Sequence, residues 1–263
     1  MRIIYILLGA SLGSVLLLWA GVYGQLKRKL ALGAALSLML IAGGLLLLAV
    51  LPGNSFYGPV LTRVDTQKKL IALTFDDGPY PPYTQRLLQV LADKKVKATF
   101  FLVGDNVARH PEVARTVQAQ GHELALHAGI HQDLLKLNQA ELTHNIHHGK
   151  AILAQELGVT PHYMRPPHGF KDWLVANTIQ DNQLQICNWS IIPRDWTNPG
   201  AQTIAERVIS KAEPGAIVLL HDGDSPKMRA PRQQTVEATA MIIDELRKQG
   251  YEFVTVSELL SRK

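Results

Sequence analysis

The segment LIALTFDDGP, residues 70–79, decides the fold of this 263-residue chain. Its apolar first half predicts a buried β-strand, and Gly78-Pro79 predicts that the strand ends abruptly. Asp76 and Asp77 therefore stand where a strand ends. Because successive residues of an extended chain point to opposite sides, one carboxylate can hold a metal while the other moves a proton. Asp and Gly are also common turn formers, so the pair alone is equally compatible with a plain turn.

Short apolar segments alternate with amphipathic ones from about residue 60 to the end, a pattern typical of parallel α/β proteins. The predicted strands cover residues 70–75, 98–103, 123–127, 162–166, 184–190, 216–221 and 252–255. The predicted helices cover residues 83–94, 111–120, 138–157, 171–181, 201–212 and 232–249. Seven strands are too few for a regular eight-unit barrel. We therefore expect a distorted, incomplete (β/α) barrel of about seven strands.

The N-terminal 51 residues predict a two-helix membrane hairpin. Residues 3–24 and 30–51 contain no charged side chain, and each stretch is long enough to cross a hydrocarbon core of about 30 Å. The basic sequence QLKRK at 25–29 predicts a cytoplasmic loop, which places the rest of the chain on the outer face of the cell membrane. A signal peptide is the alternative for residues 1–24, because Arg2 precedes an apolar run.

This pattern predicts three parts: the hairpin at 1–51, a linker at 52–66 and a catalytic domain at 67–263. The formal net charge of +5 suits a protein that works beside anionic lipid or an acidic wall polymer. The charge is too modest and too scattered to predict a nucleic-acid partner. Cys187 is the only cysteine, so no intramolecular disulfide is expected.

Two histidines, His127 and His131, follow the predicted strand 123–127. Four residues apart on a helical turn, the two rings share one face and can close on a single ion. With Asp77 they form a set of two imidazoles and one carboxylate, which leaves coordination positions open for water and substrate. A pair of structural histidines and an iron site of the oxygenase type are the alternatives.

Three further predicted strands lead into residues suited to catalysis. His221 ends the strand 216–221, and its titration near neutral pH suits a general acid. Arg165 lies in the stiff sequence RPPHG and can orient a carboxylate. The loop at 189–196 supplies Asp195 and Trp196, and an aromatic ring in such a loop can stack on a sugar or pack in the core.

Taken together, these segments resemble the five ordered motifs of the polysaccharide deacetylase family, also called the NodB-homology or carbohydrate esterase family 4 domain. The motifs are TFDDGP at 74–79, HAGIH at 127–131, RPPHG at 165–169, DW at 195–196 and LLH at 219–221. The resemblance covers residues 68–258. It implies a metal-dependent hydrolase that removes N-acetyl groups from an envelope polysaccharide containing N-acetylglucosamine, such as peptidoglycan or a chitin-like oligomer. An O-acetyl esterase and a non-catalytic, membrane-tethered glycan-binding module are the alternatives.

The resemblance also implies a role for each motif residue. The implied ligands of a divalent metal, usually zinc but with cobalt or another transition metal as alternatives, are Asp77, His127 and His131. The implied catalytic residues are Asp76 as general base, Arg165 as its partner, His221 as general acid and Asp195 as the residue that tunes it.

Three more residues are implied to contact substrate. His168 would offer its main-chain N–H to the oxyanion, Trp196 would line the site, and Leu219 would face the acetyl methyl group. The chain departs from the family pattern at Ala128, where a hydroxyl residue is usual, and at Ser190, where an acid is common. His168 itself often corresponds to a tyrosine.

Overall fold

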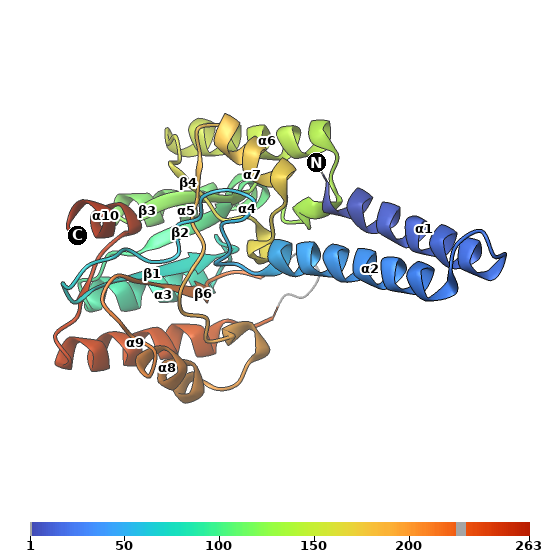
Figure 1. Cartoon of the computed structure of the whole chain (residues 1–263). Helices are drawn as coiled ribbons and strands as arrows, with labels where there is room; N and C mark the ends of the chain where they lie inside the picture. Colours follow the sequence, from blue (N-terminus) through green and yellow to red (C-terminus); the bar gives the residue numbers. More distant parts are fainter. Residues whose placement is uncertain (1, 225–229) are drawn as a thin grey trace.

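The computed structural model describes residues 2–224 and 230–263 and shows a parallel sheet covered by helices, from which two long helices project (Figure 1). All seven predicted strands are present, although some are shorter than expected. They are β1 (Leu70–Asp76), β2 (Thr99–Val103), β3 (Glu123–Ala128), β4 (Tyr163–Met164), β5 (Gln185–Ile186), β6 (Ala216–His221) and β7 (Glu252–Phe253).

The sheet is curled and not closed. Its order is β5-β4-β3-β2-β1-β6, with β7 beside the start of β1, and all pairs are parallel. The chain beyond β5 turns toward the opposite edge, where Ile191 bridges Val218 of β6. This arrangement confirms the predicted incomplete barrel. It also brings the carboxyl ends of the strands to one rim, where side chains from distant segments can meet.

The six helices predicted for the soluble part are present, and two short ones were missed. The helices are α3 (Tyr83–Asp93), α4 (Gly104–Arg109), α5 (Pro111–Ala119), α6 (Gln139–Leu157), α7 (Trp173–Asp181), α8 (Ala201–Ile209), α9 (Gln233–Lys248) and α10 (Val256–Ser261). Single 3₁₀ turns form η1 (Leu134–Lys136), η2 (Pro167–Gly169) and η3 (Asp195–Thr197). The missed helices, α4 and α10, have six residues each, which is too short for a helical period to show.

The strands form the core, and β1 is its centre. All seven residues of β1 are buried, as expected for a parallel strand covered on both faces. Phe75 and Phe100 meet in that core with ring centroids 5.3 Å apart. A rigid core under the rim fixes where the side chains at the strand ends lie.

Helices α1 (Ile3–Val22) and α2 (Arg28–Val50) are the two apolar segments at the N-terminus. They pack against each other and project side by side from the sheet (Figure 1). Both are long and apolar enough to cross a membrane, and most of their side chains face outward. A signal sequence would meet the same criteria for α1. Residues 52–66 run back over the domain, where Tyr57 and Val64 are buried.

Candidate active site

The two adjacent aspartates lie at the carboxyl end of β1. Asp76 is the last residue of the strand, whereas Asp77 takes a left-handed conformation with φ 73°. The main-chain N–H of Gly223 donates to the Asp76 carbonyl at 3.2 Å. A Cβ atom at Gly223 would lie 2.1 Å from the Asp77 carbonyl oxygen, so only glycine fits there. The turn therefore holds the two carboxylates in fixed and different directions.

Asp77, His127 and His131 converge into one cluster. The Nε2 atoms of both histidines lie 3.2 Å from Asp77 Oδ1, and the three candidate ligand atoms lie within 4.8 Å of one another. His127 Nδ1 donates to the Arg165 carbonyl at 2.8 Å, which turns Nε2 toward Asp77. Two imidazole nitrogens and one carboxylate oxygen are a donor set that fits a divalent transition metal.

The rings meet for a different reason than the sequence spacing suggested. His127 lies in β3, and the chain turns directly after Ala128, so His131 returns to the rim through a loop and not along a helix. Burial raises the pKa of Asp77, but the hydrogen bonds and charge of the two histidines outweigh it and hold that pKa well below its usual range. The carboxylate is thus anionic at neutral pH.

Asp76 is paired with Arg165, which is completely buried. Arg165 Nη1 donates to Asp76 Oδ1 at 2.7 Å and to Thr74 Oγ1 at 2.8 Å. Its other nitrogens donate to the carbonyls of Cys187 and Asn188, and its guanidinium lies over the ring of Phe101. Every contact of the guanidinium fixes its orientation, and the guanidinium in turn fixes the Asp76 carboxylate.

His221 and Asp195 form a second pair on the rim. His221 Nδ1 lies 2.8 Å from Asp195 Oδ1, and the His221 main-chain N–H donates to Oδ2 at 2.9 Å. Burial lowers the pKa of His221, but the Asp195 charge and hydrogen bond raise it to about 9. His221 is the register partner of Asp76 on the neighbouring strand. A carboxylate and a protonated imidazole therefore stand side by side.

The three residues implied to contact substrate lie around these pairs. His168 is exposed, has φ 63°, and lies beside the His131 ring with centroids 5.6 Å apart. The Trp196 ring meets the His221 ring edge-on at 5.3 Å. Leu219 lies in β6, two residues before His221, and is buried.

Sequence reasoning missed several supporting residues. Thr235 of α9 donates to Asp195 Oδ2 at 2.9 Å, and Thr84 of α3 donates to Asp222 Oδ2 at 2.6 Å. Burial and the charge of Asp77 raise the pKa of Asp222 to about 7. The sequence around a threonine in a helix does not indicate a distant partner. Asp222, however, directly follows His221 at a strand end, so the same pattern that identified Asp76 could have identified it.

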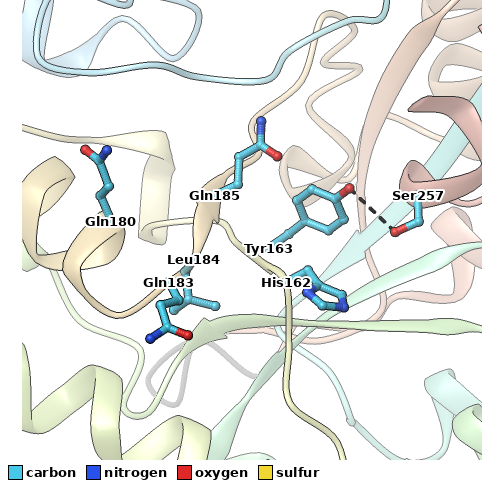
Figure 2. Close-up of a pocket in the computed structure, with 7 residues that line it drawn as sticks. All are labelled: His162, Tyr163, Gln180, Gln183, Leu184, Gln185 and Ser257. Carbon is cyan, nitrogen blue, oxygen red and sulfur yellow. Dashed lines mark hydrogen bonds between the residues drawn. The ribbon is translucent and has the colours of Figure 1, made fainter. Parts of the chain in front are cut away.

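Figure 2 shows a separate hollow, which has a volume of about 540 Å³. It is lined by His162, Tyr163, Gln180, Gln183, Leu184, Gln185 and Ser257. His162 and Leu184 precede β4 and β5, so the hollow opens at the amino ends of these strands, away from the aspartates. Its polar lining includes a hydrogen bond of 3.5 Å between Ser257 and Tyr163.

An incomplete parallel barrel with a buried carboxylate–arginine pair, a histidine–carboxylate pair and a candidate metal site on its carboxyl rim defines an α/β protein with the side chains that hydrolysis requires. Comparison with known proteins shows the family to which it belongs. A family model described as polysaccharide deacetylase matches residues 63–187. A peptidoglycan-N-acetylglucosamine deacetylase of Bacillus cereus is 41% identical over 208 residues, covering 78% of this chain and 95% of that protein. The chain therefore belongs to the polysaccharide deacetylase family, as its motifs indicated.

Other relatives agree on the enzyme class. A chitooligosaccharide deacetylase of Bradyrhizobium is 38% identical over 196 residues, covering 72% of this chain and 90% of that protein. The crystal structure of the Bc1960 peptidoglycan N-acetylglucosamine deacetylase matches with a TM-score of 0.72 and 31% identity, covering 77% of this chain and 92% of that one. An acetyl xylan esterase from Clostridium thermocellum, in complex with cobalt, matches with a TM-score of 0.67 and 33% identity, covering 74% and 91%. The chain is thus a deacetylase of a metal-dependent hydrolase family.

Proposed function

We propose that this protein is a membrane-anchored, metal-dependent hydrolase that removes N-acetyl groups from a glycan containing N-acetylglucosamine, yielding a free amine and acetate. One observation carries the proposal. Asp76, paired with Arg165, and His221, paired with Asp195, are register partners at the carboxyl ends of β1 and β6. Relatives that act on peptidoglycan and on chitooligosaccharides support the substrate class.

Asp76 is the general base in this mechanism. Arg165 occupies Oδ1 of Asp76, which leaves Oδ2 as the acceptor of a proton. As the water oxygen forms its bond to the acetyl carbonyl carbon, Asp76 takes the proton from that water. The position of the carboxylate is fixed by the buried guanidinium, so little reorganisation is needed at this step.

Asp77, His127 and His131 are the metal ligands in this proposal. A divalent metal held there would supply Lewis-acid polarisation of the water and of the acetyl carbonyl. Zinc is the metal we propose, with cobalt as an alternative, because both accept two imidazoles and a carboxylate. The main-chain N–H of His168, at the edge of the same cluster, is the proposed donor to the carbonyl oxygen as it gains charge.

His221 is the general acid. With a pKa of about 9 it is protonated at neutral pH, and its Nδ1 is engaged by Asp195. Nε2 can then donate a proton to the amine nitrogen as the carbon–nitrogen bond breaks. Trp196 and Leu219 line the site beside it, with Leu219 proposed to face the methyl group of the acetyl.

The anchor in this proposal is the hairpin of residues 1–51, followed by the catalytic domain at 67–263. The basic loop at 25–29 favours a cytoplasmic position for the far end of the hairpin. The catalytic domain then lies on the outer face of the membrane, where an envelope glycan is found.

Acetate release by the full chain in detergent tests the proposal. The substrates are peptidoglycan, N-acetylglucosamine oligomers and acetylated xylan, each with zinc, cobalt or a chelator. We expect release from an N-acetylated substrate that stops with the chelator and with Asp77→Ala, whereas Asp93→Ala, at an exposed aspartate of α3, leaves it unchanged. Release from acetylated xylan alone would favour an O-acetyl esterase, the function of one structural relative. Release that survives chelation and Asp77→Ala would refute the mechanism.

A further inference from the structure

The outer ends of α1 and α2 are held by two adjacent buried side chains. Lys171 Nζ donates to the main-chain carbonyl of Pro52 at 3.2 Å, just beyond the end of α2. Asp172 Oδ2 accepts from the main-chain N–H of Ile3 at 3.1 Å, and its Oδ1 pairs with Arg2 at 3.4 Å. A carboxylate at a helix N-terminus and an ammonium group at a helix C-terminus both complement the helix dipoles. The two helix ends are thus fixed to the domain.

Apolar packing reinforces this attachment. Ile3 and Ala49 belong to the same buried cluster as Ile71, Leu73 and Phe75 of β1. On the domain side, Leu134 of η1 belongs to that cluster, and η1 contacts α1. Tyr57 donates its hydroxyl to the carbonyl of Leu45 in α2 at 2.6 Å. The hairpin is therefore docked on the domain and is not a loose tether.

The docked helix end lies close to the catalytic base. The Pro52 carbonyl accepts from Asn188 Nδ2 at 2.7 Å, the Asn188 carbonyl accepts from Arg165 at 2.8 Å, and Arg165 donates to Asp76 at 2.7 Å. Pro52 also lies 3.3 Å from the position of a Cβ atom at Gly169, the last residue of η2. Two residues, Asn188 and Arg165, therefore link the end of α2 to the base.

The lengths of the helices set the level of this rim in a membrane. With 20 and 23 residues, α1 and α2 are about 30 Å and about 35 Å long. The hydrocarbon core is about 30 Å thick, and each headgroup layer adds about 5–7 Å. Spanning helices of this length emerge at the hydrocarbon boundary, so the docked rim lies in or directly above the headgroup layer.

Side chains around the rim suit a position in the headgroup layer of the membrane. Among the described residues beyond Leu51, the most exposed large hydrophobic side chains are Phe56, 51% exposed, and Ile130, 39% exposed. Ile130 directly precedes the candidate ligand His131. Phe56 packs against Trp173 with ring centroids 5.4 Å apart, at the base of the hairpin. Trp and Tyr side chains are enriched at membrane interfaces, and Trp173 at this position fits that preference.

From this geometry we infer that the substrate is an N-acetylated sugar carried on a membrane lipid. The inference rests on the proposed N-deacetylase function and narrows it. A rim fixed at the headgroup layer presents Asp76 and His221 to a sugar joined to a lipid headgroup. A polymer far from the membrane would need the domain to lift away, which the Lys171 and Asp172 contacts oppose.

The test compares two substrates in one vesicle system. The full chain with zinc is reconstituted in phosphatidylethanolamine and phosphatidylglycerol vesicles. One substrate is a dialkylglycerol glycoside of N-acetylglucosamine embedded in the vesicles, and the other is a soluble N-acetylglucosamine oligomer at equal sugar concentration. We expect the lipid-borne sugar to be deacetylated at least about tenfold faster.

Variants separate docking from simple membrane attachment. In Lys171→Met and Asp172→Asn the spans and the catalytic residues remain, so we expect the lipid advantage to fall at least about threefold while the oligomer rate stays unchanged. Lys150→Met is the matched control, because Lys150 of α6 donates to a main-chain carbonyl, that of Asn182, away from the hairpin.

The outcomes distinguish this inference from the proposed function. An oligomer deacetylated as fast as the lipid-borne sugar would overturn the inference and leave the N-deacetylase function intact. If neither substrate loses its acetyl group, both the proposed function and the inference are refuted. If the docking variants fail to fold, the comparison of the two substrates with the unaltered protein still decides.

Discussion

Replacing Asp195 with asparagine is expected to lower the pH at which activity is lost on the alkaline side. Asp195→Asn keeps the size of the side chain and removes its charge. In the native protein burial lowers the pKa of His221, but the Asp195 charge and hydrogen bond, 2.8 Å from Nδ1, together with the charges of Asp77 and Asp76, raise it from 6.5 to about 9. In the proposed mechanism His221 acts in its protonated form, so we expect activity to be retained up to about pH 9 and to be lost as the pH rises through that value.

The structure gives the size of the effect. A rise in pKa from 6.5 to about 9 corresponds to about 3 kcal/mol. Opposite charges 2.8 Å apart attract by about 6 kcal/mol at an effective dielectric constant of about 20. The attraction therefore exceeds the free energy that corresponds to this rise in pKa, and the difference offsets the burial of His221. Without the Asp195 charge, we expect the alkaline limb of the pH–activity profile to move down by at least about one pH unit.

The assay is the pH dependence of kcat/KM for acetate release in Asp195→Asn. Thr235→Val is the control, because it removes one hydrogen bond to Asp195 and leaves the charge in place; its alkaline limb should stay within about half a pH unit of the native one. Thermal unfolding of both variants excludes global destabilisation. An unchanged alkaline limb in Asp195→Asn would refute the assignment of His221 as the acid controlled by Asp195.

Three further changes test other parts of the structure. Arg165→Met leaves the Asp76 carboxylate buried without its partner and should lower the free energy of unfolding, measured with urea, by about 3–5 kcal/mol. Adding Asp76→Asn should recover part of this loss, and an unchanged urea midpoint for Arg165→Met alone would contradict the prediction. Gly215→Ala, at φ 80°, puts a Cβ atom 1.8 Å from a main-chain carbonyl oxygen and should lower the Tm more than Gly158→Ala, where φ is 65° and the space is open. An equal loss of Tm in the two variants would show that the strain at Gly215 is not steric. Asp77→Ala should abolish zinc binding in titration calorimetry with the fold retained, and undiminished binding would place the metal elsewhere.

The strands and the rim were predictable because each depends on neighbouring residues. Asp76, His127 and His221 each lie at the carboxyl end of an apolar run that forms a strand, and parallel strands bring these ends together. The sequence alone could therefore name Asp76, His127 and His221 as neighbours. It could not supply how the His127 and His131 rings meet, because that depends on a turn after β3 whose path is set by α6: Asn145 accepts from the main-chain N–H of Gly129 at 2.9 Å.

Contacts between distant segments were beyond the sequence. Lys171 and Asp172 begin a predicted helix, and nothing near them indicates partners more than 110 residues away at both ends of the hairpin. The region at 52–66 has the composition of a linker, yet Tyr57 is buried in it and bonds to α2. For α10 a local signal did exist, since Thr255 and Glu258 form a capping box that marks a helix start.

The most direct test of the account is the balance of products. The full chain, loaded with zinc, is incubated with an N-acetylglucosamine substrate, and acetate and free amine are measured in the same sample for the native protein and for Asp76→Asn. We predict equal amounts of acetate and amine from the native protein and a large loss of both in Asp76→Asn, since the proposed base at the end of β1 is removed. Acetate without amine, or equal rates for the two proteins, would contradict it.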